Sequence, residues 1–231
     1  MSGTISMAYL LAGVLFIRSL GGLSRQETAR EGNLAGLLGM ALAVVVTIIV
    51  WFSQGAQLPA MTMLLGAAAV GSVIGATLAR RVEMTGMPEL VAMLHSFVGL
   101  AAVLVGVSSY LQPAHDPAHG LVGAAASAAR TLHAVEIWIG VAVGALTVTG
   151  SIVAWAKLRG TLSGKPLLLP ARHGLNLLVV SALVVLAVPF MAAPTPEAGL
   201  PWLLADAALA GLLGVHLVMA LGGADMPVVV S

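Results

Sequence analysis

The sequence predicts an all-α fold, a polytopic transmembrane bundle of about seven spanning helices followed by the start of an eighth. Of the 231 residues, 59% are hydrophobic and only 8% are charged. Soluble domains usually carry about 25% charged residues, roughly three times as many. The mean hydropathy is +1.04. Apolar stretches long enough to cross a bilayer recur along the chain, separated by short polar or Pro/Gly-marked loops.

The predicted helices follow one another with short connections. The first is retained rather than cleaved, because Arg18 and Arg25 follow its apolar stretch, the reverse of a signal peptide. The fourth opens at Pro88, where the missing N–H of proline is not needed. A second Met-Pro pair opens the segment from Ala224 to Ser231, which we interpret as the start of an eighth helix that continues in a longer chain. The expected ranges are 4–22, 34–52, 59–79, 88–110, 131–156, 174–193 and 201–221.

The basic residues predict the orientation in the membrane. Nine of the ten lie at the end of the first helix or in the loops after the first, third and fifth: Arg18, Arg25, Arg30, Arg80, Arg81, Lys157, Arg159, Lys165 and Arg172. Only Arg130 lies on the opposite side. Cytoplasmic loops carry the excess of Lys and Arg, so we expect the N-terminus outside and Asp225 at the cytoplasmic side.

Small residues recur at helix-packing spacing on the fourth and fifth predicted helices. They are Ala92, Ser96, Gly99, Val103 and Gly106, and then Gly140, Gly144, Thr147 and Ser151. Small faces let two backbones approach closely, which favours helix association in lipid. We therefore expect each of these faces to pack closely against a neighbouring helix.

His95 is the most informative residue, because it lies about 10 Å deep in the fourth predicted helix at 1.5 Å per residue. Ionisable groups in hydrocarbon usually face a bundle interior or a water-filled path, and histidine exchanges protons near neutral pH. The other polar groups form a series from outer acids through hydroxyls to an inner histidine: Glu136, Asp206, Thr147, Thr149, Ser151 and His216. This order predicts a proton path. The alternative is structural, with the histidines bonding neighbouring helices and the acids partly hydrated at the interface.

Composition also excludes several classes of site. The chain has no cysteine, which excludes disulfides and thiolate metal sites, and its net charge of +1 provides no basic face for nucleic acid. No glycine-rich nucleotide-binding motif is present, so no cofactor site is expected on this segment. His115, Asp116 and His119 resemble a metal-ligand set, but Pro117 interrupts them and a solvated turn is the favoured interpretation.

Five segments of the sequence resemble the membrane domain of the beta subunit of proton-translocating NAD(P) transhydrogenase. They are LGGLSRQETAREGN (20–33), VEMTGMPELVAMLHSFVGLAA (82–102), TGS (149–151), GKPLLLPARH (164–173) and GGADMPVVVS (222–231). These segments occur in order along essentially the whole chain. The longest, 82–102, contains His95.

The resemblance implies a role for the segment and for several residues. The family couples hydride transfer from NADH to NADP⁺ to inward proton flow, in a bacterial-type cytoplasmic (inner) membrane. Residues 1–231 would be the proton-translocating membrane domain, and NADP(H) and NAD(H) would bind soluble domains, the NADP(H) domain following Ser231. His95 and Ser151 would belong to the proton path. Asp225, with Lys165 and Arg172 in the basic inner loop, would couple the bundle to the NADP(H) domain.

The resemblance also implies partners, and the residues leave alternatives open. The expected partners are an alpha-type transhydrogenase subunit, the NADP(H)-binding domain of the same subunit, membrane lipid and a second copy of the whole assembly. A proton-coupled secondary transporter could use the same histidine, although the two Met-Pro entries on one side suit an inverted repeat poorly. A purely structural membrane anchor is the third interpretation. Proton flux separates the first interpretation from the third.

Overall fold

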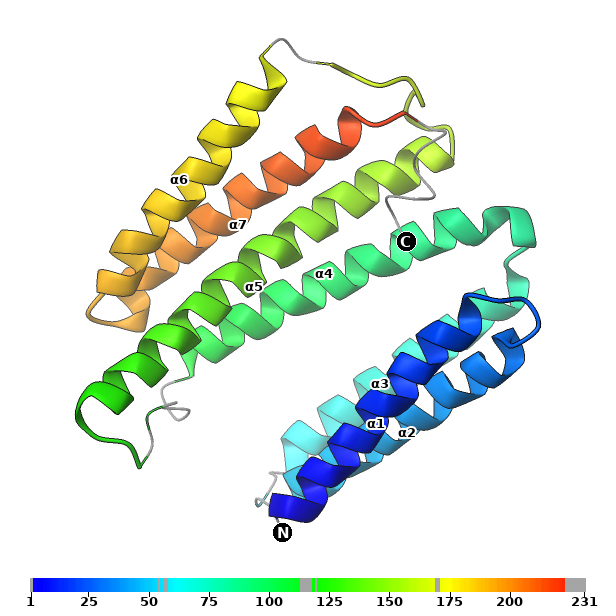
Figure 1. Cartoon of the computed structure of the whole chain (residues 1–231), viewed down its shortest axis with the longest axis horizontal. Coiled ribbons are helices and arrows are strands. Elements are labelled where there is room, and N and C mark those ends of the chain that lie inside the picture. Colours follow the sequence, from blue (N-terminus) through cyan, green and yellow to red (C-terminus); the bar gives the residue numbers. More distant parts are fainter. Residues whose placement is uncertain are drawn as a thin grey trace. The chain divides into compact units, whose positions relative to one another are not determined.

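The computed structural model describes residues 2–53, 55, 58–112, 118, 120–168 and 171–222, and these form helices without any strand. The helices are α1 (Ser2–Leu23), α2 (Ala29–Ser53), α3 (Leu58–Arg81), α4 (Met87–Leu111), α5 (Gly123–Leu158), α6 (Arg172–Ala192) and α7 (Pro196–Met219), with a 3₁₀ turn, η1 (Met84–Gly86), before α4. All seven α-helices are long and apolar enough to cross a membrane (Figure 1). The predicted all-α bundle is confirmed. The start of the eighth helix, 224–231, lies outside the described residues.

Three helices begin well before their predicted first residue, and the first of them is α2, which begins at Ala29 rather than at 34. Helix α5 begins at Gly123 rather than at 131, because the intervening residues are mostly alanine, which has the highest helix propensity. Helix α7 begins at Pro196 rather than at 201. Its N-cap is Thr195, whose hydroxyl accepts a hydrogen bond from the Ala198 amide at 3.3 Å. The prediction placed all three starts at the edge of the apolar stretch, whereas the helices extend past that edge.

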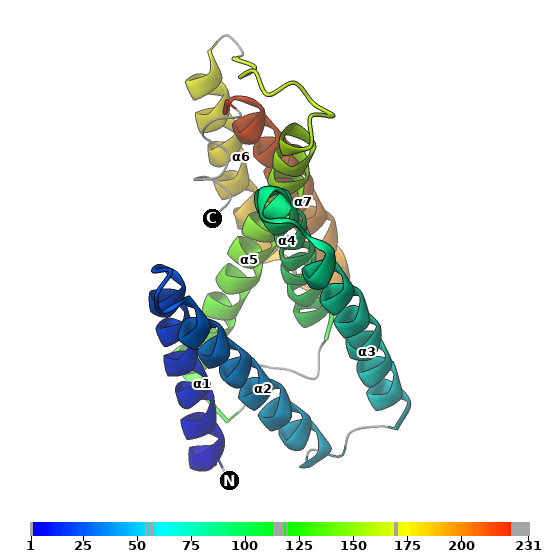
Figure 2. The same cartoon turned by 90° about the vertical axis from the view of Figure 1, so that its right-hand side faces the viewer.

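The first of two compact units covers residues 1–80 and contains α1, α2 and most of α3. Helices α1 and α2 pack side by side along their lengths (Figures 1 and 2). Their closest approach is at Gly22 and Gly32, where a Cβ on Gly22 would lie 2.6 Å from the Gly32 Cα. Toward the other end of the pair, the Tyr9 hydroxyl lies 2.9 Å from the Thr47 hydroxyl. Glycine is therefore required where the two backbones meet.

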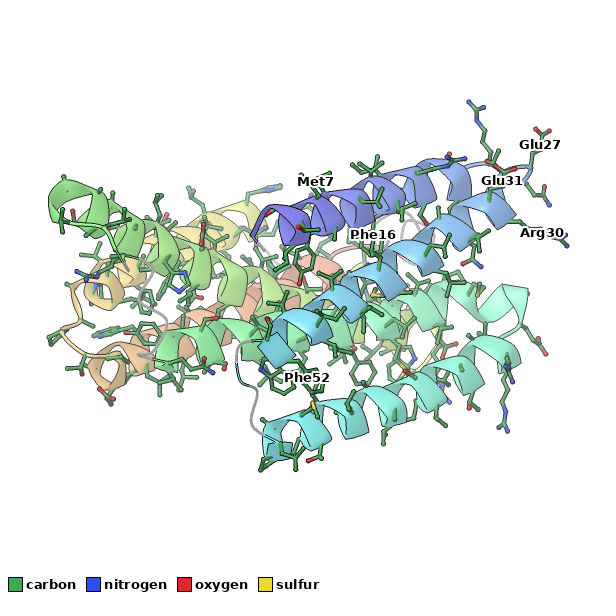
Figure 3. All side chains as sticks on the ribbon, turned by 90° about the horizontal axis from the view of Figure 1, so that it is seen from below. Met7, Phe16, Glu27, Arg30, Glu31 and Phe52 are labelled. Atoms are coloured by element: carbon green, nitrogen blue, oxygen red, sulfur yellow. The ribbon has the colours of Figure 1, made fainter. Side chains whose placement is uncertain are left out.

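Charged side chains of this unit gather at the turn between α1 and α2. Glu27, Arg30 and Glu31 lie together at this end, far from Phe52 at the other end of α2 (Figure 3). The turn is held by the Thr28 hydroxyl, which donates to the Gly22 carbonyl at 2.8 Å. This polar turn is one of the connections that the prediction placed at the cytoplasmic surface.

The second unit covers residues 81–231 and is organised around α5. Helix α4 packs on α5, α5 packs on α7, and α6 packs on α7 (Figure 1). At the end of the unit that contains the α6–α7 turn, the ring of Phe190 contacts the rings of Tyr110 and Trp138, with centroids 4.8 and 4.9 Å apart. Val141 and Leu203 complete this core, and both are fully buried. Helix α5 is therefore the helix on which both α4 and α7 pack.

Candidate functional site

The contact between α4 and α5 is made by two glycines and sets the register of the site. A Cβ on Gly99 would lie 2.7 Å from the Gly144 carbonyl oxygen, and one on Gly144 would lie 2.9 Å from the Gly99 carbonyl oxygen. Ala92 and Gly106, which lie seven residues (about two turns) before and after Gly99, are also buried. The predicted close packing of the two small-residue faces is thus confirmed, and the structure shows that they pack on each other. Gly140 is the exception, since a Cβ there would meet nothing within 4 Å.

A shallow groove of about 550 Å³ runs along one side of this helix pair. Helix α4 contributes Val98, Gly99 and Ala102, and α5 contributes a row that includes Glu136, Gly140 and Thr147. Because residues three and four apart share a helix face, His95 continues the α4 row and Ser151 continues the α5 row. Glu136 lines the groove, and helical spacing puts His95 and Ser151 on the same side of the α4–α5 pair.

The imidazole of His95 is exposed in this chain and bonds to its own helix. Its Nδ1 lies 2.9 Å from the Val91 carbonyl oxygen. A carbonyl oxygen can only accept, so Nδ1 carries the hydrogen and the neutral ring has Nε2 free as its proton acceptor. The backbone of α4 thus determines which ring nitrogen of His95 is available to exchange a proton.

Glu136 and Ser151 occupy the two ends of the α5 row. The Glu136 side chain is 77% exposed, and its Oε2 lies 3.8 Å from Nδ1 of His133, which is on the same helix. Ser151 is half-buried. Between them, the Thr147 hydroxyl donates to the Val143 carbonyl at 2.7 Å. The α5 row therefore has a carboxylate at one end and hydroxyl groups toward the other.

Asp206 is separate from the groove and lies inside the unit. It is 0% exposed on α7, and neither carboxyl oxygen has a hydrogen-bond partner among the described residues. Leu203 and Ala210, one turn before and after, are also buried. An ionised carboxylate in such a place would cost several kcal/mol without a partner. A neutral carboxyl would avoid this charge cost, although its oxygens would still lack partners among the described residues.

His216 belongs neither to the α4–α5 groove nor to the buried surroundings of Asp206. It is half-buried and lines a pocket of about 370 Å³ between α6, α7 and the loop that precedes α6. The other side chains of this pocket are apolar, and they include Leu167, Leu175 and Val179. The predicted series of polar groups is thus divided by the structure into an α4–α5 groove, a buried acid and an isolated histidine.

Thr149 is also separate from the predicted series of polar groups. Its hydroxyl donates across the helix interface to the Gly211 carbonyl of α7 at 2.7 Å. Thr149 therefore faces α7, whereas Thr147 faces the groove, although both were expected to line one path. The two-residue separation turns the side chains by about 200°, which explains the difference.

Lys157 is the residue that the sequence interpretation placed wrongly. It was expected in the loop after the fifth helix, but it lies in the last turn of α5 and is 5% exposed. Its Nζ donates to three carbonyl oxygens at the end of α7. A signal was present in the sequence, because Lys157 follows Val153 and Ala154 at helical spacing and so shares their buried face.

The residues expected to couple the bundle to a soluble domain lie near the loop between α5 and α6. Lys165 is exposed in this loop, and Arg172 opens α6 with its Nε 3.3 Å from Nε2 of His173. Asp225 lies outside the described residues. So do His115, Asp116 and His119, and no group of three metal-ligating side chains occurs in the part of the chain that is described.

Comparison with known proteins identifies the family. Residues 5–231 match the family model described as the NAD(P) transhydrogenase beta subunit. Two curated relatives, from Rhodospirillum rubrum and from a designated strain of that species, are both named NAD(P) transhydrogenase subunit beta. Each is 44% identical over 232 aligned residues, covering 100% of this chain and 47% of the relative. The chain thus spans about half the length of these relatives. Seven membrane-length helices and a match over nearly every residue establish that this chain is an integral membrane segment belonging to the NAD(P) transhydrogenase beta subunit family.

Proposed function

We propose that residues 1–231 form the proton-conducting membrane domain of a transhydrogenase that couples hydride transfer from NADH to NADP⁺ to inward proton movement. The observation that carries the proposal is the match of the whole chain to the transhydrogenase beta subunit, in a segment built of membrane helices. Hydride transfer would take place on soluble domains that bind NAD(H) and NADP(H). This segment would supply the route for the proton.

His95 is the proton-exchanging group of the proposal. Its Nδ1 is held by the Val91 carbonyl, which leaves Nε2 to take a proton from the outer side and release it inward. Glu136 would collect protons at the outer end of the groove, and Ser151 would hold water near His95. The geometry supports this division because all three residues lie on one side of the α4–α5 pair.

Asp206 would serve as a second proton group in the interior. Both of its oxygens lack a partner among the described residues, so the carboxyl is free to bond water or to exchange a proton. His216 is kept in the proposal as a group near the inner end of α7. Its apolar pocket supports a weaker role than that of Asp206.

The proposal requires helices from other chains or copies around α4. His95, Phe97 and Val98 are exposed in the isolated chain, and an ionisable group on a membrane helix normally faces a bundle interior. We propose that the alpha-type subunit covers this face, and that two copies of the whole assembly associate within the lipid. The NADP(H) domain of the same subunit would contact Lys165, Arg172 and Asp225 at the cytoplasmic surface.

The coupling can work only if nucleotide binding distinguishes two states of the bundle. A ligand shifts an equilibrium only by binding the two states unequally. The NADP(H) domain would therefore have to contact the loop between α5 and α6 differently before and after hydride transfer. His95 would be open to the outer side in one state and to the cytoplasm in the other.

The test uses the full-length subunit with its partners, reconstituted in sealed vesicles with the cytoplasmic face outward. NADPH and an NAD⁺ analogue are added outside, and analogue reduction and internal pH are followed together. In this direction the protein should acidify the interior, and a protonophore should abolish the acidification while turnover continues. Hydride transfer with no pH change would reject the proposal and leave the segment as a membrane anchor. Dependence on a transported solute would indicate a secondary transporter instead.

A further inference from the structure

The C-terminal end of α7 is held by a buried amine from another helix. Nζ of Lys157, in the last turn of α5, lies 3.1, 2.8 and 2.8 Å from the carbonyl oxygens of Val218, Met219 and Leu221. The lysine is 5% exposed, so water does not compete freely for these bonds. The amine thereby supplies a donor to three carbonyl groups at and just beyond the end of α7, of which the Val218 carbonyl also accepts from the Leu221 amide at 3.2 Å.

The chemistry of the three bonds identifies the form of the amine. An ammonium group has three donors and no acceptor, which matches three carbonyl acceptors. A neutral amine would have only two N–H donors and would direct its lone pair at the third carbonyl. The C-terminal end of a helix carries partial negative charge, and this favours a cation there. Among the described residues the carbonyl groups at the end of α7 are the partners of this amine.

The same helix end is also bonded to the loop between α5 and α6. The Leu167 amide donates to the Met219 carbonyl at 2.9 Å. This carbonyl therefore accepts from both Lys157 and Leu167. The loop between α5 and α6 is thus bonded to the end of α7 through Leu167, two residues after Lys165. The end of α7 is in turn bonded to α5 through Lys157.

Helix α4 completes this junction. Ala92 is fully buried against Ala154 of α5, and Val218 of α7 and Leu221, two residues after α7 ends, pack against this pair. Ala92 lies three residues before His95, slightly less than one helical turn away. Four parts of the chain therefore meet around Lys157: the ends of α5 and α7, the loop before α6, and the turn of α4 that precedes His95.

We propose that Lys157 is a positioning residue that makes this junction rigid, so that a change at the α5–α6 loop moves the α4 turn bearing His95. This inference rests on the proposed function. Without the ammonium, Val218, Met219 and Leu221 would lose their shared donor. The loop and the end of α7 would then move independently of α4, and hydride transfer would continue with less proton movement.

The experiment compares Lys157→Met and Lys157→Arg with wild type in the full assembly. Methionine keeps the length and apolar stem of the side chain but removes its donors, whereas arginine keeps the charge and the donors. Arg130→Met is the matched control, because it removes a cation from the opposite end of α5. The readout is the number of protons moved per hydride transferred, which does not depend on the amount of folded enzyme. Amide hydrogen exchange at residues 216–221 is measured on the same samples.

The expected result for Lys157→Met is a fall of at least about fivefold in protons per hydride, the lower end of ordinary coupling between sites. Amide hydrogen exchange at residues 216–221 should become faster in Lys157→Met. In Lys157→Arg, both the protons per hydride and the exchange rate should return most of the way to their wild-type values. The control should match wild type. If Lys157→Met lowers only the yield of folded assembly while protons per hydride stay at the wild-type value, the inference is overturned. A wild type that moves no protons would instead reject the proposed function, and the exchange data would still test the junction.

Discussion

The backbones of Gly99 in α4 and Gly144 in α5 are in direct contact. Neither glycine could carry a side chain without a clash with the backbone of the other. The built Cβ positions lie 2.7 and 2.9 Å from the carbonyl oxygen of the partner glycine. Because both obstacles are backbone atoms, no rotamer change can relieve the clash. This contact fixes the register of the groove and hence the position of His95 relative to Ser151.

Alanine at Gly99 or Gly144 should separate the two helices. Overpacking of a close contact typically costs about 1–3 kcal/mol, so we expect a lower unfolding temperature and weaker proton coupling. Gly140→Ala is the control, because its Cβ would enter the open groove. Thermal unfolding of the purified assembly in detergent measures the effect. Equal unfolding temperatures for Gly144→Ala and Gly140→Ala would show that the helices do not meet as described.

Thr149→Val should weaken the contact between α5 and α7. The Thr149 hydroxyl donates to the Gly211 carbonyl at 2.7 Å, and interhelical hydrogen bonds in membranes contribute on average about 0.6 kcal/mol. Thr147→Val is a matched control, because its hydroxyl bonds only within α5. We expect a small but measurable drop in unfolding temperature for Thr149→Val alone. A larger drop for Thr147→Val would contradict the assigned orientation of α5.

Asp206→Asn should fold normally but move fewer protons. Asparagine nearly matches the aspartic side chain in size and avoids a buried charge, so stability should change by less than about 1 kcal/mol. An amide cannot exchange a proton, so protons per hydride should fall if Asp206 is on the path. The two quantities are measured by thermal unfolding and by the vesicle assay. Wild-type coupling in this variant would assign Asp206 a structural role only.

Thiol labelling would test whether the α4–α5 groove holds water. The segment has no cysteine of its own, so a single cysteine can be placed at will. Gly140→Cys and Thr147→Cys face the groove and should react with a small water-soluble thiol reagent in the assembled protein. Ala145→Cys, at a buried position facing α7, should not react. Protection of all three positions would mean that lipid or protein fills the groove and excludes water.

Helix number and much of the helix packing could be predicted from the sequence. Apolar length identified all seven helices, because the bilayer requires such lengths whatever the tertiary packing. Small-residue spacing identified the packing faces of α4 and α5, but the structure was needed to show that these faces meet. The starts of α5 and α7 were missed because residues beyond the apolar core extend a helix through propensity and capping, which hydropathy does not report.

The candidate site was less predictable, because it depends on how each helix is rotated. Depth in the membrane can be counted along the chain, and this placed Asp206, Thr149 and His216 in plausible order. Depth does not reveal which neighbour a side chain faces. The rotation of α7 buries Asp206 and directs His216 toward α6, and Thr149 turns away from the groove. Lys157 was assigned to a loop because the predicted fifth helix ended at 156, whereas α5 continues to Leu158 and carbonyl groups at the end of α7 bind the amine.

The most direct test of the account is proton movement in His95→Ala. The full assembly is reconstituted with wild type, His95→Ala or Ser96→Ala, whose hydroxyl bonds only to the Met93 carbonyl of its own helix. NADPH-driven reduction of an NAD⁺ analogue and internal pH are recorded together. We expect acidification with wild type and Ser96→Ala, and none with His95→Ala despite normal assembly. Proton movement per hydride at the wild-type level in His95→Ala would contradict the central claim that this histidine conducts the proton.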